Sequence, residues 1–151
     1  MKRLIPLFTL IMVVAGCSGS SDSGQVQAVP TERPPLAVCA GLAGTYGLSL
    51  NDFTDFGYQA LANKRIGGYI TIDNRCDATI WVPSADREII FTGEGAATDL
   101  VSNLMFILSS ESKPAEAIGK TVYAQVSAVD QRVTNGRIEG TDVTFTGTKL
   151  P

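Results

Sequence analysis

Apolar and polar side chains alternate along much of the C-terminal third of this chain, which is the pattern of a β-strand with one face in a core. In residues 122–128, valine and alanine alternate with larger or polar side chains. Farther along, Val143 and Phe145 are expected to face the core, and Thr144 and Thr146 the solvent. The alternation predicts several short strands after residue 120.

Turn-forming residues divide this region. Asn135-Gly136 is a strong signal for a two-residue type I′ hairpin turn, because both central positions of that turn need a positive φ angle. Gly140-Thr141-Asp142 predicts a second turn between two short strands, because glycine and aspartate favour tight turns.

A second region with a period of two predicts a hairpin over residues 69–82, with the turn at "NRCD". Ile70 and Ile72 share one face of its first strand, and Ile80 lies on the core face of the second. Trp81 then points the other way. Either both faces of the sheet are covered, or Trp81 is partly exposed.

The remaining segments are assigned less directly. Residues 44–50 and 87–93 predict two more strands, and 51–65 a loop with a helical turn, because Gly57 weakens a longer helix. Residues 98–110 carry an apolar stripe that fits a helix, but "LMFILSS" also fits a buried strand. We favour a strand, because the segments on both sides are strands. Residues 111–120 are predicted as a loop.

Seven or eight short strands with closely spaced turns predict an all-β domain, either a small antiparallel β-sandwich or a β-barrel, with room for one short helix. Gly44-Thr45-Tyr46 resembles the opening of lipocalin-like barrels, a resemblance that covers three residues and assigns no family to the domain.

The N-terminus has a different pattern. Lys2 and Arg3 precede an uncharged run at 4–15, which is too short to cross a membrane as a helix and has the length of a signal-peptide core. The following Val14-Ala15-Gly16-Cys17 resembles the lipobox of bacterial lipoprotein precursors, a resemblance that covers the first 17 residues only.

The resemblance implies that residues 1–16 are a signal peptide, that the thiol of Cys17 takes a diacylglycerol, and that its new amino group is acylated, with palmitate as the expected chain. Ser18, where some relatives have aspartate, implies the outer membrane of a Gram-negative envelope, with the domain facing the periplasm. The alternatives are an ordinary secreted protein in which Cys17 is a free or paired thiol, and an uncleaved anchor.

Residues 17–35 are rich in serine, glycine and proline and predict a lipidated, disordered tether. Fully extended, residues 18–35 reach at most roughly 60 Å. Residues 36–151 have the size of a single domain with one core.

Cys39 and Cys76 are the only other cysteines. Because an exported protein meets an oxidising compartment, we expect them to form a disulfide, which would stabilise the domain by about 3–4 kcal/mol in the chain-entropy model. Two buried thiols or a metal pair are the alternatives. Two thiolates without histidine do not complete a four-coordinate zinc site, so no metal is expected.

Candidate chemistry is sparse. Without histidine, a Ser-His-Asp triad and a Cys-His dyad are excluded. Two groups of acidic and amide residues could offer oxygens to calcium, but neither has an EF-hand spacing, and such residues are common in turns. The two groups are Asn51, Asp52 and Asp55, and Asp73, Asn74 and Asp77.

The net charge argues against nucleic acid as a partner. Of the 12 basic and 15 acidic side chains, Lys2 and Arg3 lie in the expected signal peptide, so the rest of the chain carries a net charge of −5. The charges are dispersed without a basic patch, and nucleic acid binding is not expected.

These observations favour a membrane-anchored envelope lipoprotein, held by a lipid at Cys17, that acts as a non-catalytic binding or assembly accessory, with another envelope protein as its partner. A docking patch could come from Trp81, Met105 and Ile107. The first alternative is a barrel that carries a small lipid-like ligand, with Ala124 and Ala128 on a small-residue face. The second is an enzyme inhibitor. No catalytic residue and no cofactor are predicted.

Overall fold

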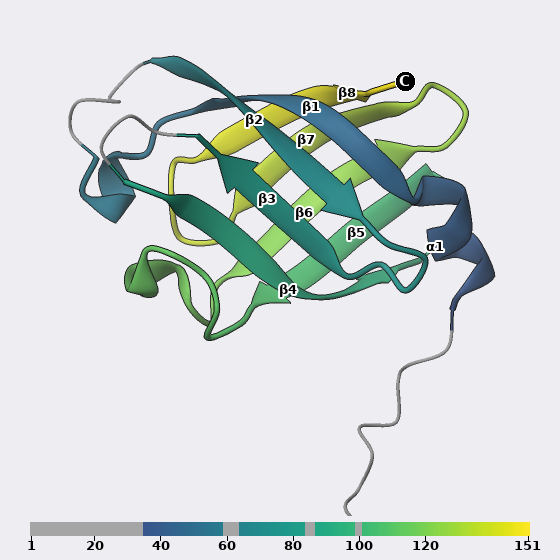
Figure 1. Ribbon diagram of the computed structural model, residues 1–151, viewed down its shortest axis with the longest axis horizontal. Coiled ribbons are helices and arrows are strands. Elements are labelled where there is room, and N and C mark those ends of the chain that lie inside the picture. The colour runs from purple at the N-terminus through teal and green to yellow at the C-terminus, as the bar shows by residue number, and fades with distance from the viewer. Residues whose placement is uncertain (1–34, 59–63, 84–86, 99–100) are drawn as a thin grey trace, which may run out of the picture. The chain divides into compact units, whose positions relative to one another are not determined.

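The computed structural model describes residues 35–58, 64–83, 87–98 and 101–151, all of which belong to one compact unit, Arg33–Pro151. The described residues form eight antiparallel strands in which each strand pairs with the next one along the chain (Figure 1). The elements are α1 (Ala37–Leu42), β1 (Gly44–Asn51), η1 (Thr54–Phe56), β2 (Arg65–Ile72), β3 (Ala78–Val82), β4 (Ile89–Ala97), β5 (Val101–Leu108), η3 (Ala115–Ala117), β6 (Thr121–Ser127), β7 (Arg132–Ile138) and β8 (Thr144–Lys149).

The first and last strands pair with each other, and this pairing closes the sheet into a barrel. β1 and β8 run antiparallel in a register that extends from Tyr46 opposite Lys149 to Asn51 opposite Thr144. The all-β prediction is therefore confirmed, and of its two architectures the chain adopts the barrel. Closure leaves no edge strand among the eight described strands, which removes the usual site of edge-to-edge aggregation.

Large side chains fill the barrel. An eight-stranded barrel is just wide enough for inward-facing side chains to occupy its interior. Phe53, which follows β1, stacks on Phe91 of β4 with ring centroids 6.3 Å apart, and Phe56 of η1 lies 5.3 Å from Phe91. Tyr46 and Tyr58 are buried as well, so the aromatic side chains described between residues 46 and 58 belong to the core. The largest fully buried side chains are Tyr46, Phe53, Phe91, Phe106, Phe145, Leu42, Leu50, Ile70, Ile72, Ile80, Ile89 and Leu104.

The predicted strand in residues 98–110 is confirmed as β5, with residues 99–100 outside the described residues. Leu104, Phe106 and Leu108 are buried, whereas Met105 and Ile107 are exposed, so every second residue enters the core. A helix is excluded because the apolar face of a helix would bury Met105 together with Leu104, whereas Met105 is exposed. The predicted loop at 51–65 contains the short helix η1, as expected, with residues 59–63 outside the described part.

The turn predicted at Asn135-Gly136 is wrong. These residues lie inside β7, at a β-bulge. Along the bulge, β7 advances by three residues while each of its neighbours, β6 and β8, advances by two. The hairpin between β6 and β7 turns instead at residues 128–131, where Ser127 Oγ accepts a hydrogen bond from Asp130 N at 3.0 Å. Asn135 does have the positive φ, 51°, that makes this dipeptide common in hairpin turns.

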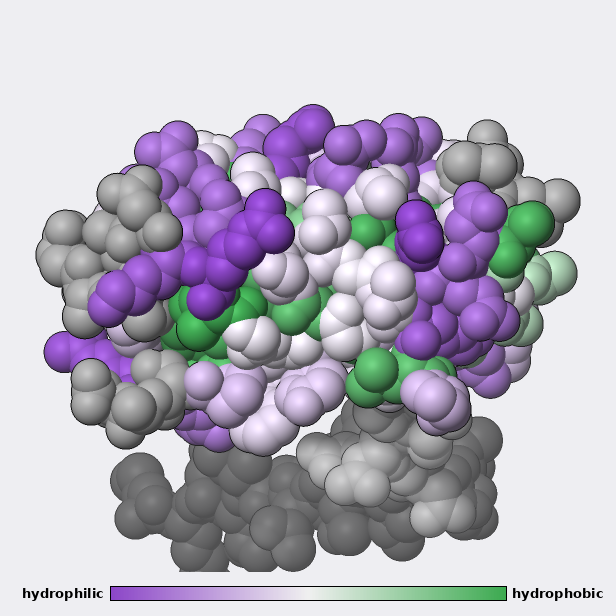
Figure 2. Space-filling view, turned by 90° about the horizontal axis from the view of Figure 1, so that it is seen from above, coloured by the Kyte–Doolittle hydropathy of each residue, from purple (hydrophilic) through white to green (hydrophobic). Residues whose placement is uncertain are grey.

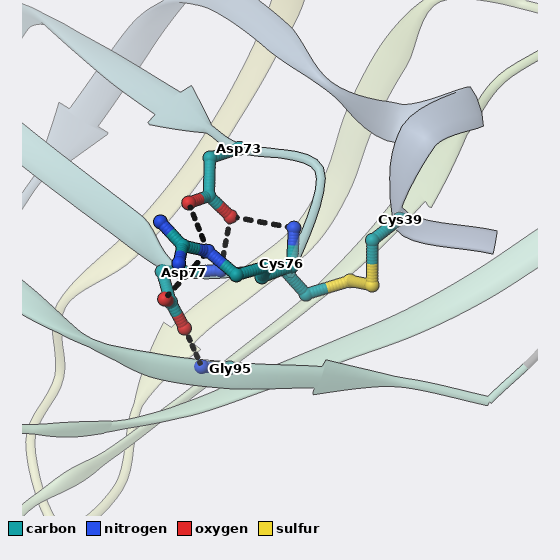
Figure 3. A network of polar contacts seen from close by, with 6 residues as sticks. Cys39, Asp73, Cys76, Asp77 and Gly95 are labelled. Atoms are coloured by element: carbon teal, nitrogen blue, oxygen red, sulfur yellow. Dashed lines mark hydrogen bonds and ion pairs between the residues drawn. A yellow bond between two sulfur atoms is a disulfide. The ribbon is translucent and has the colours of Figure 1, made fainter. Parts of the chain in front are cut away.

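A short helix that the sequence analysis did not predict, α1, precedes β1. Its last carbonyls are capped by side chains, because Tyr46 Oη donates to Leu42 O at 2.7 Å and Lys149 Nζ donates to Ala43 O at 2.7 Å. Burial raises the pKa of the Tyr46 phenol. The predicted disulfide joins Cys39 of this helix to Cys76 in the loop between β2 and β3, and both cysteines are fully buried (Figure 3).

The carboxylate of Asp73 organises the loop that carries Cys76 (Figure 3). Its Oδ1 accepts hydrogen bonds from Arg75 N at 2.7 Å and Asp77 N at 2.9 Å, and its Oδ2 lies 3.4 Å from Arg75 Nε. Burial would raise the pKa of Asp73, but these hydrogen bonds and the Arg75 charge together hold the pKa below its ordinary value. Asp77 Oδ1 in turn accepts a hydrogen bond from Gly95 N, which ties the loop to β4.

We predict that Asp73→Asn destabilises the folded protein by about 1 kcal/mol or less, since solvent screens this half-exposed carboxylate. A lowered folded-state pKa means that the ionised carboxylate stabilises the fold above its unfolded pKa and loses this effect as pH falls through the folded value. Urea unfolding from about pH 7 to pH 2 should therefore show the difference between wild type and variant shrinking below about pH 4. A difference that persists at low pH would contradict this role of the charge.

Candidate ligand-binding groove

The sequence-predicted site residues have different outcomes. Cys17 lies outside the described residues, so its lipidation stays a prediction. Cys39 and Cys76 form a buried structural disulfide. The carboxylates of Asp73 and Asp77 accept hydrogen bonds from backbone N–H groups. Within the described ranges, no group of three or more cysteine, aspartate and glutamate side chains could hold a metal ion.

The three residues expected to form a docking patch are exposed, but they do not meet. Trp81 is 45% exposed on β3, whereas Met105 (41%) and Ile107 (56%) lie on β5, with β4 between them. The outward neighbours of Trp81 are Tyr69 and Ile90 in the strand register. The predicted patch is therefore two separate groups on the outer wall.

A row of polar residues crosses the seam where β1 meets β8. In the register, Arg65 of β2 lies opposite Asn51 of β1, Asn51 opposite Thr144 of β8, and Thr144 opposite Arg137 of β7. Thr144 Oγ1 donates to Asn51 Oδ1 at 2.6 Å across the seam. The closure of the barrel thus brings two arginines, which are 72 residues apart in sequence, to the two ends of one row.

The outer wall is hollowed along this row. The depression has a volume of about 420 Å³ and is formed by β2, β1, β8 and β7. We call it the seam groove. Its lining offers guanidinium, amide and hydroxyl groups. The lining residues are Ser49, Asn51, Arg65, Asn135, Gly136, Arg137, Thr144, Phe145 and Thr146.

The charge in the groove has one sign. None of its described lining residues is acidic, and neither Arg65 nor Arg137 forms an ion pair with another described residue. The guanidinium carbon of Arg137 lies 4.8 Å from the centre of the Tyr123 ring, a cation–π contact that positions the side chain but leaves its charge uncompensated. Two such guanidinium groups suit a carboxylate or phosphate, because their forked N–H donors match these anions.

The bulge in β7 shapes one wall of the groove. Val133 and Ile138 both face the core although they are five residues apart, which is an odd number of steps. The bulge adds one residue, so that Thr134 and Asn135 both face outward and the inward–outward alternation of side chains is restored after them. Asn135 is then fixed by its Nδ2, which donates to Gln125 Oε1 at 2.6 Å. Bulges of this kind often re-aim a side chain next to a binding site.

A second depression of about 440 Å³ continues the groove along β1, β8 and β7, with Ser49 and Thr146 lining both. It adds Gly47, Thr134 and Arg132 to the lining. Figure 2 views this side of the barrel, over β1, β2 and β8, where hydrophilic and neutral residues cover most of the surface. This side of the outer wall is therefore a polar, arginine-bearing surface.

This site was not predicted from the sequence. The charges are dispersed along the chain, since Arg65, Arg132 and Arg137 are not neighbours in sequence. The register brings them to one side of the barrel. A sequence signal did exist, namely the odd spacing of Val133 and Ile138, which fits a bulge as well as a turn between them.

Comparisons with known proteins add no assignment, because no protein-family model, curated protein or solved structure matches this chain. None of the helices among the described residues is both long and apolar enough to cross a membrane. The chemistry of the groove is therefore the basis for a functional proposal.

We predict that Gly136→Ala destabilises the protein by about 1–3 kcal/mol, because a Cβ at this position would meet ring carbons of Phe145 from the partner strand β8. Asn135→Gly is the matched variant in the same bulge. It keeps a residue that tolerates φ of 51°, so it should cost less than about 1 kcal/mol. Urea unfolding of both variants measures the difference. Equal losses would contradict the packing of Phe145 over Gly136.

Proposed function

We propose that this chain is a lipid-anchored protein of the bacterial envelope whose barrel binds a negatively charged ligand on its outer wall and catalyses no reaction. The observation that carries the proposal is the seam groove, in which Arg65 and Arg137 face solvent without a compensating acid. Binding sites usually combine a concave surface with a few convergent polar groups. This groove is concave, and its lining carries guanidinium, amide and hydroxyl groups.

The interior of the barrel argues against the carrier alternative. A carrier needs an apolar space, but side chains such as Phe91, Phe106 and Phe145 are fully buried inside the strands. Ala124 is small, yet its strand neighbours Val122 and Val126 are buried on either side of it. A lipid-sized ligand would have to displace several of these side chains, at about 1.5–3 kcal/mol for each large one re-exposed to water.

The envelope location is proposed from residues 1–35 alone. Cys17 follows a basic start, a short apolar run and a lipobox-like sequence, and the tether after it would let the barrel stand clear of the membrane. A barrel held this way can meet anionic groups attached to the membrane or within the periplasm.

We predict that Cys17→Ser abolishes membrane attachment. Two or three acyl chains, at about 0.8 kcal/mol per buried CH₂, hold a protein on a membrane almost permanently, and serine offers no thiol for the diacylglycerol. In a Gram-negative host, the wild type should fractionate with membranes and incorporate labelled palmitate. The variant should do neither. Unchanged membrane fractionation and labelling of the variant would contradict the lipid anchor.

We predict that the full-length protein in detergent binds pyrophosphate, used here as a compact anionic probe, and that Arg65→Ala and Arg137→Ala each weaken this binding about tenfold or more. The expected loss follows from removing a hydrogen bond between two charged groups, about 1.5–3 kcal/mol. Binding should also weaken as NaCl is raised, because salt screens exposed charges.

The matched control removes two positive charges elsewhere, with Arg87→Ala and Lys120→Ala combined, since neither residue lines the groove. Calorimetric titration should give the control the wild-type affinity. If the control loses as much affinity as the groove variants, or if the wild type does not bind, the groove is not an anion site.

A further inference from the structure

A pair of exposed aromatic rings lies on the outer wall, outside the seam groove. Tyr69 of β2 and Trp81 of β3 are cross-strand partners with ring centroids 5.9 Å apart and planes tilted by 20°. They are 41% and 45% exposed. Aromatic rings of this size bury 150–250 Å² each in cores and interfaces, so a stacked pair in solvent forms a small apolar platform on the outer wall.

The platform is connected to the groove along β2 through Gly67, which has no side chain. Tyr69 lies opposite Gly47 of β1, but the Leu150 side chain lies beside Gly47, 3.2 Å from the place of a Cβ, so the open connection does not run over Gly47. Two residues before Tyr69, Gly67 lies opposite Ser49, which lines both depressions. Nothing lies within 4 Å of the place where a Cβ of Gly67 would be, so this path stays open to solvent.

The two ends of this path differ in chemistry. Arg65 and Tyr69 are four residues apart on the same strand, about 13 Å, with Gly67 between them. One end offers guanidinium groups, the other offers aromatic faces, and Ser49 and Thr146 lie between with hydroxyl groups. A ligand that fits all three must be elongated, must carry a negative charge, and must be rich in both hydroxyl groups and C–H faces.

Acidic sugars have this combination. The C–H groups on one face of a pyranose ring carry a slight positive charge and pack on the negative face of an aromatic ring. Their hydroxyl groups match serine, threonine and asparagine, and their carboxylate or phosphate groups match arginine. A protein partner would favour an apolar core within the contact area, but glycine, serine and threonine occupy the centre of this surface.

We infer that the ligand of this protein is an acidic oligosaccharide whose carboxylate or phosphate groups pair with Arg65 and Arg137 at the two ends of the row and one of whose sugar rings stacks on the Tyr69–Trp81 pair. The inference rests on the proposed function, because it names the ligand class of the same groove. It adds the aromatic platform, on which the anion site itself does not depend.

Trp81 is the only tryptophan of the chain, so its fluorescence reports directly on the platform. The experiment titrates the full-length protein in detergent with tetragalacturonic acid, with the neutral galactotetraose as the probe of equal length, and with pyrophosphate. We expect tetragalacturonate to bind and to change the Trp81 emission. Galactotetraose should bind at least tenfold more weakly, and pyrophosphate should bind without changing the emission.

Variants then separate the two ends, with binding measured by calorimetry because Trp81→Ala removes the fluorophore. Tyr69→Ala and Trp81→Ala should each weaken tetragalacturonate binding about tenfold and leave pyrophosphate binding unchanged. Arg65→Ala should weaken both. Met105→Ala, which removes another exposed apolar side chain from the outer wall, is the control and should change neither.

The outcomes distinguish this inference from the proposed function. If pyrophosphate and tetragalacturonate bind with equal affinity in the wild type and in both aromatic variants, the groove is an anion site only and the oligosaccharide inference is overturned. Equal binding of the acidic and the neutral tetrasaccharide overturns the role of the arginines. If none of the three probes binds, the inference and the proposed function both fail.

Discussion

The pairing of β1 with β8 is the interaction on which the rest of this structure depends. It joins segments at the two ends of the domain through a register that runs from Tyr46 opposite Lys149 to Asn51 opposite Thr144. Without it, the sheet would have two free edges, and inward-facing residues such as Leu48 and Leu50 would lose the neighbours that bury them. Residues 44–51 form one side of the seam and residues 144–149 the other, so the seam joins segments about 100 residues apart in sequence.

The same seam carries the candidate site, and this links the fold to the proposed function. The interior is occupied by side chains whose burial stabilises the barrel, so the space for a ligand lies on the outer wall. There, Asn51 and Thr144 come together only through closure, and Arg65 and Arg137 flank them. The bulge at Asn135 completes the wall, and Gly136 lets the Phe145 ring pack beneath it. Residues that pair across the seam to close the barrel, such as Asn51 and Thr144, therefore also line the groove.

Much of the fold could be predicted from the sequence because alternation is a local signal. Every second residue of β5 enters the core, and this period separates a strand from the helix that the same apolar residues could form. The disulfide followed from the two remaining cysteines of a chain with an export-like N-terminus. The Asn135-Gly136 dipeptide was misread because a positive φ serves a bulge as well as a turn. The helix α1 was missed because its caps, Tyr46 and Lys149, follow it in sequence, and Lys149 is distant.

The site was harder to predict than the fold, for a physical reason. Register decides which residues of distant strands become neighbours, and register depends on the closure of the whole barrel. Arg65, Arg137 and the Tyr69–Trp81 pair are unremarkable in their own segments. They come to one side of the barrel only when β3, β2, β1, β8 and β7 lie side by side.

The closure of the barrel is tested most directly by nuclear Overhauser contacts between β1 and β8 in the isotopically labelled protein. The account predicts contacts between Leu48 and Gly147 and between Leu50 and Phe145, together with slow hydrogen exchange of the β1 amides in this register. An absence of these contacts, with rapid exchange of the amides along both strands, would show an open sheet. The core, the seam groove and the functions proposed for it would then all be contradicted.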